Sequence, residues 1–349
     1  MHRRVICACL MIAVLALLAF CAGAEDADVK IDASGQWKYV LEDGSATLTG
    51  YVVEPEGDLV IPKELDGNVV TGIGNGAFAW CESLTSVTIP DSVTSVGEGA
   101  FMRCFALTSV TIPDSVTSIG DFAFMGCEGL TSIVIGNSVT SIGRVTFANC
   151  SNLTSVTIGS SVASIGDAAF SSTSLTSITL PESVIRIGRN PFSNSPVTHC
   201  DVAPNNPVFE SMDGVLFDTQ QKILISYPGA KEGAYTVPEG TLIIGHNAFK
   251  GSSGVTGVTI PDSVTVIGYL AFAECSNLTS VMIGNSVTYI DHFTFTGCPN
   301  LISVTIPESV SLMGRLTFTG CEEIILSVKK GSFAERFAQH HGIAYVYIK

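Results

Sequence analysis

Hydrophobic residues recur along this chain with a period of 23 residues. Within one period, the apolar residues Leu107, Val110 and Ile112 are separated by polar ones. Ser109 and Thr111 alternate with the last two, which is the two-residue spacing of a short strand with one buried face. Phenylalanine marks one position of the period ten times, at Phe78, Phe101, Phe124, Phe147, Phe170, Phe192, Phe249, Phe272, Phe295 and Phe318. A fixed period of this length predicts a solenoid, in which stacked coils bury one another's apolar faces.

The rest of each period predicts how a coil closes. Proline or glycine ends the strand, and Val116 and Ile119 then point inward on a second, looser extended segment. Gly120 allows a backbone turn that a Cβ atom would hinder. The stretch up to Phe124 and Cys127 is expected to form a helical turn or a short helix on the outer side. Successive strands would lie about 4.8 Å apart in a parallel sheet, and the phenylalanines would form a continuous buried spine.

Two repeats show a family resemblance. IPDSVTSIGDFAFMGCEGLTSI (residues 112–133) and IGNSVTSIGRVTFANCSNLTSV (residues 135–156) resemble the BspA-like leucine-rich repeat family, in which proline or glycine follows the strand where common leucine-rich repeats have an asparagine ladder. The resemblance covers roughly residues 36 to 345. It implies an α/β solenoid, a right-handed superhelix of about ten 23-residue coils with a parallel β-sheet. It also implies an N-terminal β-hairpin cap and a C-terminal helix-strand cap.

These features divide the chain into six expected segments. They are a signal peptide (1–24), an N-terminal cap (25–60), leucine-rich repeats (61–202), an inserted β island (203–236), further repeats (237–326) and a C-terminal cap (327–349). The island reads as strands with turns at Asp213-Gly214 and Gln220-Gln221, and it is expected either to protrude from the stack or to form an enlarged coil. In the C-terminal cap, Ser332 and Glu335 have the spacing of a capping box, and Gly342 is a helix stop.

The first residues predict export. Arg3 and Arg4 precede an apolar stretch from Leu10 to Phe20, and Ala22-Gly23-Ala24 has the small-residue pattern that predicts cleavage after Ala24. An uncleaved anchor and a lipoprotein modified at Cys21 are the alternatives. No second apolar run is long enough for a membrane span after signal cleavage. The sequence therefore predicts a secreted or cell-surface protein.

Charge limits the partners. Without the two arginines of the signal peptide, 15 basic residues stand against 32 acidic ones, a net charge of −17. Nucleic acids and anionic lipids are bound by basic patches, so neither is an expected partner. The expected partners are therefore extracellular proteins or glycans.

The cysteines and histidines predict no cofactor or metal site. Outside the signal peptide, seven of the eight cysteines occupy one repeat position, namely Cys81, Cys104, Cys127, Cys150, Cys275, Cys298 and Cys321. Their parallel Cβ vectors, about 4.8 Å apart, are too far apart for disulfides, so they are expected to be buried free thiols. His199 and Asp201 face outward on one strand and could bind a polar ligand. No catalytic triad, phosphate loop or paired carboxylates occur at a recognisable spacing, so no enzyme is expected.

The outward strand positions form two polar ladders of serine and threonine. Specific binders are expected to carry aromatic or arginine anchors, which are scarce on these ladders. The candidate binding residues are Trp80, Phe105, Val134, His199, Asp201, Met282 and Tyr289. The sequence predicts a protein that mediates protein–protein interaction, and the resemblance implies adhesion to host matrix or to other cells. The alternatives are a structural spacer of a surface assembly, a polymer- or ice-binding surface that uses the ladders, and a hydrolase that uses the island.

Overall fold

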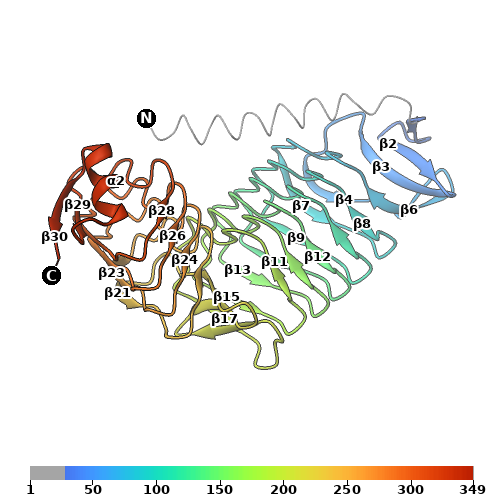
Figure 1. Ribbon diagram of the computed structural model, residues 1–349. Coiled ribbons are helices and arrows are strands. Elements are labelled where there is room, and N and C mark those ends of the chain that lie inside the picture. Colours follow the sequence, from blue (N-terminus) through green and yellow to red (C-terminus); the bar gives the residue numbers. More distant parts are fainter. Residues whose placement is uncertain (1–27, 349) are drawn as a thin grey trace.

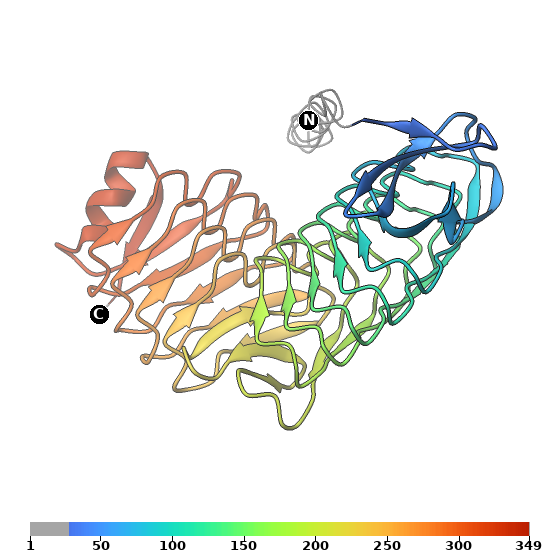
Figure 2. The same cartoon turned by 90° about the vertical axis from the view of Figure 1, so that its right-hand side faces the viewer.

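The computed structural model describes residues 28–348, which form a solenoid of about 13 turns. The coils stack from the N-terminal hairpin to the C-terminal helix, and both ends lie on the same side of a bend in the middle of the chain (Figures 1 and 2). The parallel solenoid predicted from the period is confirmed, but the expected number of about ten coils is too low. The predicted signal peptide lies outside the described residues.

Each coil contributes two short strands, so two series of parallel strands run along the solenoid instead of one. The first series contains the strands predicted from the alternating pattern. Its members are β4 (Gly57–Val60), β7 (Leu84–Thr88), β9 (Ser109–Thr111), β11 (Ser132–Val134), β13 (Ser155–Thr157), β15 (Ser177–Leu180), β17 (His199–Val202), β21 (Gly233–Thr236), β23 (Val255–Thr259), β25 (Ser280–Met282), β27 (Ser303–Ile306), β29 (Ile325–Val328) and β30 (Ala344–Tyr347). We call the outward side of this series the ladder face.

The second series is built from the looser extended segments. Its strands are mostly two residues long: β6 (Asn68–Ile73), β8 (Ser95–Val96), β10 (Ser118–Ile119), β12 (Ser141–Ile142), β14 (Ser164–Ile165), β16 (Arg186–Ile187), β22 (Ile243–Ile244), β24 (Val266–Ile267), β26 (Tyr289–Ile290) and β28 (Leu312–Met313). A short strand β5 (Glu64–Leu65) pairs with β6. Neighbouring strands pair at equivalent repeat positions, as Ser118 does with Ser95. The period therefore sets the register in both series.

The third side of each coil consists of turns, the first of the two forms expected for it, without a short helix, and we call it the turn side. Phe122 and Gly126 flank the spine residue Phe124, and both have positive φ angles, of 60° and 74°. The N–H groups of these three residues donate to carbonyl oxygens of the next coil at 2.8–2.9 Å. A short helix would turn these N–H groups back into its own coil. The left-handed residues aim them at the next coil instead, so the turn side is a third hydrogen-bonded ladder.

The phenylalanines form the buried spine on the inner side of these turns. Ring centroids of Phe124 and Phe147 lie 5.5 Å apart, with an interplanar angle of 3°. Phe192 and Phe318 are slightly exposed, and each lies at one end of a run of stacked rings. Tyr227 continues the spine by stacking on Phe249 at 4.7 Å.

The repeat position that cysteine occupies makes hydrogen bonds in addition to packing in the hydrophobic core. All eight cysteines of the described residues are free and buried. Six of the thiols lie within hydrogen-bond distance of the spine carbonyl of the preceding coil, as Cys104 Sγ does to Phe78 O at 3.1 Å. Ser195 does the same with its hydroxyl, which lies 2.9 Å from Phe170 O. The position therefore selects a small side chain with a donor, a role beyond the apolar one that the sequence suggested.

The island forms an enlarged coil that is built into the stack. Its strands are β18 (Phe209–Met212), β19 (Val215–Asp218) and β20 (Ile223–Ser226), which pair antiparallel. Asp213 and Gly214 both have positive φ angles and form the tight turn between β18 and β19. Because β20 then pairs in parallel with β22, the island continues the second series.

Two caps close the ends of the solenoid. At the N-terminal end, β1 (Lys30–Ile31), β2 (Trp37–Glu42) and β3 (Ser45–Tyr51) form an antiparallel unit, and β3 pairs in parallel with β6. At the C-terminal end, helix α2 (Phe333–His341) precedes β30. With nine residues, α2 is the only helix in the described part of the chain, and none there is long and apolar enough to cross a membrane.

The ends of α2 follow the predicted capping signals. Ser332 Oγ accepts the N–H of Glu335 at 3.2 Å, and the Glu335 carboxylate accepts the N–H of Gly331 at 2.5 Å. Gly342 ends the helix with a φ angle of 68°, which a residue with a Cβ atom rarely adopts.

Candidate interaction surface

The ladder face is a regular polar surface with few aromatic or arginine side chains that could anchor a partner. Serine and threonine fill most outward positions, in register from coil to coil. Val134 and Met282 interrupt them and are more than half exposed. They lie on β11 and β25, on opposite sides of the island, so the structure does not bring them together.

His199 and Asp201 lie side by side on the ladder face of β17, as predicted. Their side chains are about half exposed, and His199 Nε2 lies 3.5 Å from Asp201 Oδ2. His199 Nδ1 lies 3.2 Å from the hydroxyl of Thr198. Within residues 28–348, no third histidine, cysteine or carboxylate joins them to complete a metal-binding group.

Trp80 and Phe105 lie on the turn side of the first coils. The guanidinium of Arg103 covers the indole ring of Trp80 at 4.6 Å, a cation–π contact between successive coils. Phe105 is half-buried. Trp80 nevertheless remains 37% exposed, so it stays a candidate binding residue.

One column of the turn side carries alternating charges in the N-terminal half. It starts directly after the coil glycine, and its members Asp121, Arg144, Asp167 and Arg189 belong to four successive coils. Arg144 Nε lies 2.8 Å from Asp121 Oδ2, and Arg189 Nε lies 3.7 Å from Asp167 Oδ2. Each arginine therefore pairs with the aspartate of the preceding coil, and these charges neutralise one another.

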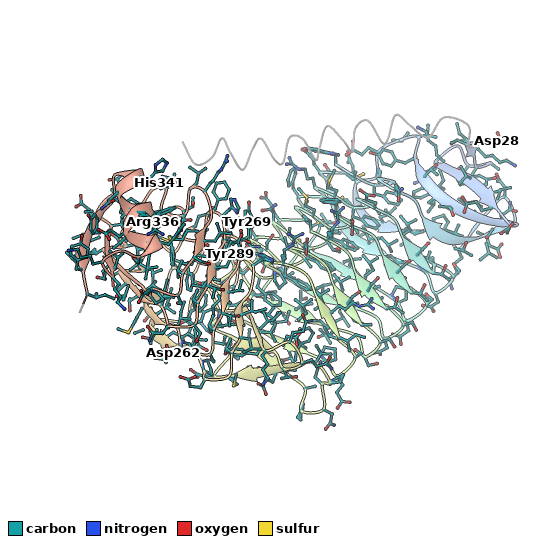
Figure 3. All side chains as sticks on the ribbon, in the orientation of Figure 1. Asp28, Asp262, Tyr269, Tyr289, Arg336 and His341 are labelled. Atoms are coloured by element: carbon teal, nitrogen blue, oxygen red, sulfur yellow. The ribbon has the colours of Figure 1, made fainter. Side chains whose placement is uncertain are left out.

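In the C-terminal half, the same side of the solenoid carries aromatic, aliphatic and cationic residues. We call this group the aromatic patch, and its residues are Tyr269, Leu270, His292, Phe293, Arg315 and Leu316. The rings of Tyr269 and Phe293 meet edge to face at 5.9 Å. Leu316 is 54% exposed and Tyr269 is 37% exposed. Figure 3 labels Tyr269 and Tyr289, which both lie in this half of the molecule.

The backbone of the patch is held in an unusual conformation. Leu270, Phe293 and Leu316 have φ angles of 54°, 58° and 58°, a region that bulky residues rarely enter. The N–H groups of Leu270 and Phe293 donate to the carbonyls of the next coil at 3.2 Å. The turn-side ladder therefore fixes these apolar side chains in one column.

A hydrogen-bond network connects the patch to strand β26. The hydroxyl of Tyr289 donates to Asp291 Oδ1 at 2.7 Å, and His292 Nδ1 lies 2.8 Å from the same oxygen. Burial would raise the pKa of Asp291, but the hydrogen bonds from Tyr289 and His292 outweigh it and lower the pKa. The bond to Asp291 raises the pKa of Tyr289 to about 12. Tyr289 is thus half-buried and fixed in place at the edge of the patch.

Sequence reasoning named Tyr289 at the edge of the patch but missed the six residues of the patch itself. The missed signal lies two residues before each spine phenylalanine. Gly76 and Gly99 occupy this position in the first coils, Phe122 and Val145 in two later N-terminal coils, and Leu270, Phe293 and Leu316 in the C-terminal half. The patch differs from these two N-terminal coils in the preceding residue, which is Tyr269, His292 or Arg315 in the patch and a paired charge in the N-terminal coils.

Comparisons with known proteins agree with this architecture. The sequence model of the family described as BspA type leucine rich repeat region (6 copies) matches residues 71–198 and 233–337. Among solved structures, the chain is similar to a leucine rich cell surface protein from Faecalibacterium prausnitzii, with 28% identity, 90% of this chain and 98% of that chain covered, and a TM-score of 0.68. No match was found among the curated proteins.

Two further solved structures share the fold. The pneumococcal vaccine antigen PcpA has 22% identity, with 93% of this chain and 100% of that chain covered and a TM-score of 0.72. A leucine-rich repeat protein from Eubacterium ventriosum has 24% identity, with 88% and 79% covered and a TM-score of 0.57. Because the family match spans more than half of the residues and the repeats stack as described, the chain belongs to the BspA-type leucine-rich repeat family.

Proposed function

We propose that this protein is a secreted or cell-surface scaffold that binds an extracellular protein through the aromatic patch. It acts without catalysis and serves adhesion to host matrix or to other cells. Residues 1–24 support export, because they have the layout of a signal peptide. The similar protein from Faecalibacterium prausnitzii is described as a cell surface protein.

The observation that carries the proposal is the composition of the patch. Aromatic residues and arginine are enriched in the energetically important parts of protein interfaces. Tyr269, Phe293 and Arg315 gather within three successive coils. On the ladder face, the corresponding positions carry mostly small polar residues. On the N-terminal turn side, Phe122 and Val145 occupy the same left-handed position, but the charges beside them pair with one another.

The strained backbone supports the same proposal. A left-handed conformation costs a residue with a side chain roughly 1–2 kcal/mol relative to its usual conformation, whereas glycine adopts it freely. Three successive coils of the C-terminal half keep bulky apolar residues at this position, as Phe122 and Val145 do in the N-terminal half. In the patch these side chains lie beside Tyr269 and Arg315, and presentation to a partner is a reason for their presence that stability does not supply.

The test measures binding of residues 25–349 to immobilised matrix proteins and glycans. Phe293→Gly removes one ring of the patch and relieves the backbone, so we expect a chain of equal or greater stability with at least tenfold weaker binding. Phe122→Gly is the matched control, since Phe122 has the same backbone conformation (φ 60°) outside the patch. Equal affinity of both variants and the unmodified chain would exclude the patch as the binding surface.

The ladder face supports a second candidate, a glycan-binding surface. Its hydroxyl groups repeat at the coil spacing, so they could contact a polymer through many weak, equal interactions. Thr111→Lys and Thr157→Lys would then weaken binding to a glycan while Phe293→Gly would not. Absence of binding to every protein and glycan in the panel would favour the structural spacer instead.

A further inference from the structure

The first series of strands ends in an open edge at each end of the solenoid. Within residues 28–348, strand β4 is the first member and pairs only with β7, and β30 is the last and pairs only with β29. On β4, the N–H groups of Gly57 and Ile61 donate to the β7 side at 3.0 and 3.1 Å. Successive residues of a strand alternate in direction, so the backbone groups of Asp58 and Val60 face the open side.

The same reasoning applies to β30. The N–H of Ile348 donates to Val328 O at 3.0 Å, so the backbone groups of Tyr345 and Tyr347 face away from β29. Both ends therefore present unpaired backbone donors and acceptors, which are a template for pairing with another strand.

An exposed valine lies at each of these edges, in the same column of the ladder face. Val60 pairs in register with Thr88 at one end, and Val346 pairs with Ser327 at the other. Val60 is 68% exposed and Val346 is 52% exposed. Threonine or serine fills most other positions of this column, which Val134 and Met282 also interrupt, and an apolar residue lies at each end.

The two caps carry opposite charge. Residues 28–60 contain seven acidic and two basic residues, whereas residues 327–348 contain three basic residues and one acidic residue. Glu54, Glu56 and Asp58 lie around a groove of about 640 Å³ beside β4, which Trp37 and Val60 also line. At the other end lie Lys330 and Arg336, together with Lys329, which pairs with Glu308 of the preceding coil. Figure 3 labels Asp28 and Arg336, which lie at opposite ends of the molecule.

We propose that copies of this protein associate head to tail, with β30 of one copy pairing in parallel with β4 of the next. In this register Val346 lies beside Val60, and the strands of the first series continue from one copy into the other. The basic C-terminal cap of one copy then faces the acidic N-terminal cap of its neighbour. The contact joins two different surfaces, so it does not close on itself and can repeat. This proposal is independent of the aromatic patch.

The test is sedimentation velocity of residues 25–349 over a wide range of concentrations and at two salt concentrations. We expect dimers and longer species to increase with concentration and to decrease with salt, which screens the charges of the caps. Val60→Lys blocks one edge and Val346→Lys blocks the other, so each variant alone should remain monomeric. A mixture of the two variants retains one intact pair of edges and should form dimers but no longer species.

Thr111→Lys, on the ladder face away from both edges, is the control and should associate like the unmodified chain. Thermal unfolding at an unchanged temperature shows that each variant is folded. The proposal is overturned if the unmodified chain is monomeric at every concentration, or if the two edge variants associate as it does. A monomeric chain that binds a short basic peptide in the β4 groove also overturns it, and assigns the groove to a peptide partner.

Discussion

Val215 and Leu216 are neighbours in strand β19 and are both completely buried, yet they belong to two different hydrophobic cores. Leu216 packs with the residues of the N-terminal coils, and Val215 packs with those of the C-terminal coils. Adjacent side chains of a strand point to opposite faces, so β19 lies between the two cores and contributes side chains to both. The island therefore divides the solenoid into two stacks.

We expect the two stacks to lose stability separately. Leu216→Ala should cost about 2–5 kcal/mol and should reduce hydrogen-exchange protection in the coils before β19 more than in those after it, because coils contact only their neighbours. Leu224→Ala, in the C-terminal core, is the matched variant and should give the opposite distribution. An equal loss of protection in both halves for either variant would show one cooperative core.

Truncation of the spine should be costly. Phe147 is completely buried between Phe124 and Phe170, so Phe147→Ala should lower the free energy of unfolding by about 3–5 kcal/mol. Urea denaturation followed by circular dichroism measures the loss. A loss below about 1 kcal/mol would contradict the packing described for the spine.

The cysteines should be inert in the folded protein. Burial raises the pKa of Cys150 and of Cys200 to about 12, well above the ordinary value of 9.0. A thiol-specific reagent should therefore find almost no reactive thiol in the native mature chain and eight after denaturation without reductant. Fewer than eight in the denatured chain would reveal disulfides.

The same pKa shifts predict that the free energy of unfolding depends on pH. Between about pH 9 and 12 the folded state keeps protons on these thiols that the unfolded chain releases. The folded state then binds more protons, so stability should fall as the pH rises through this window. Urea unfolding on both sides of pH 9 measures the effect, and Cys150→Ala should reduce it.

Two serines that replace cysteine should respond in opposite ways to the same substitution. Ser195 Oγ lies 2.9 Å from Phe170 O, so Ser195→Ala should cost about 1 kcal/mol. Ser252 Oγ is buried and has no hydrogen-bond partner among residues 28–348, so Ser252→Ala should stabilise the protein by about 1–3 kcal/mol. The midpoints of thermal unfolding compare the two variants, and a loss of stability in both would contradict the assignment of Ser252.

The sequence predicted the features that depend on one coil repeating itself. Alternation at Val110 and Ile112 predicts a strand, and the spacing of the phenylalanines fixes the register of the stack. Asp213-Gly214 predicts a tight turn because both residues tolerate positive φ angles. These signals are local, and the structure contains the solenoid, the capped helix and the turn that they indicated.

The missed features depend on contacts between coils. Val116 and Ile119 are three residues apart, so they do not show the alternation that would reveal the second series of strands. Gly120 was interpreted as a turn residue, but its φ angle is not positive. A Cβ atom there would lie 2.6 Å from the backbone nitrogen of Glu98 in the preceding coil. The aromatic patch was missed because its members come from different coils.

The side-chain hydrogen bonds between coils have a consequence for the evolution of this molecule. Thr108 bonds to the backbone of the coil before it at Thr85, and Thr117 does the same at Thr94. Both bonds span 23 residues, so each coil depends only on its immediate neighbour. Removal of residues 112–134 would join Thr111 to Ile135 and would recreate the same neighbours. Gene duplication or deletion in steps of one coil can therefore change the length of the protein, and with it the distance between its two ends, without redesign of the remaining coils.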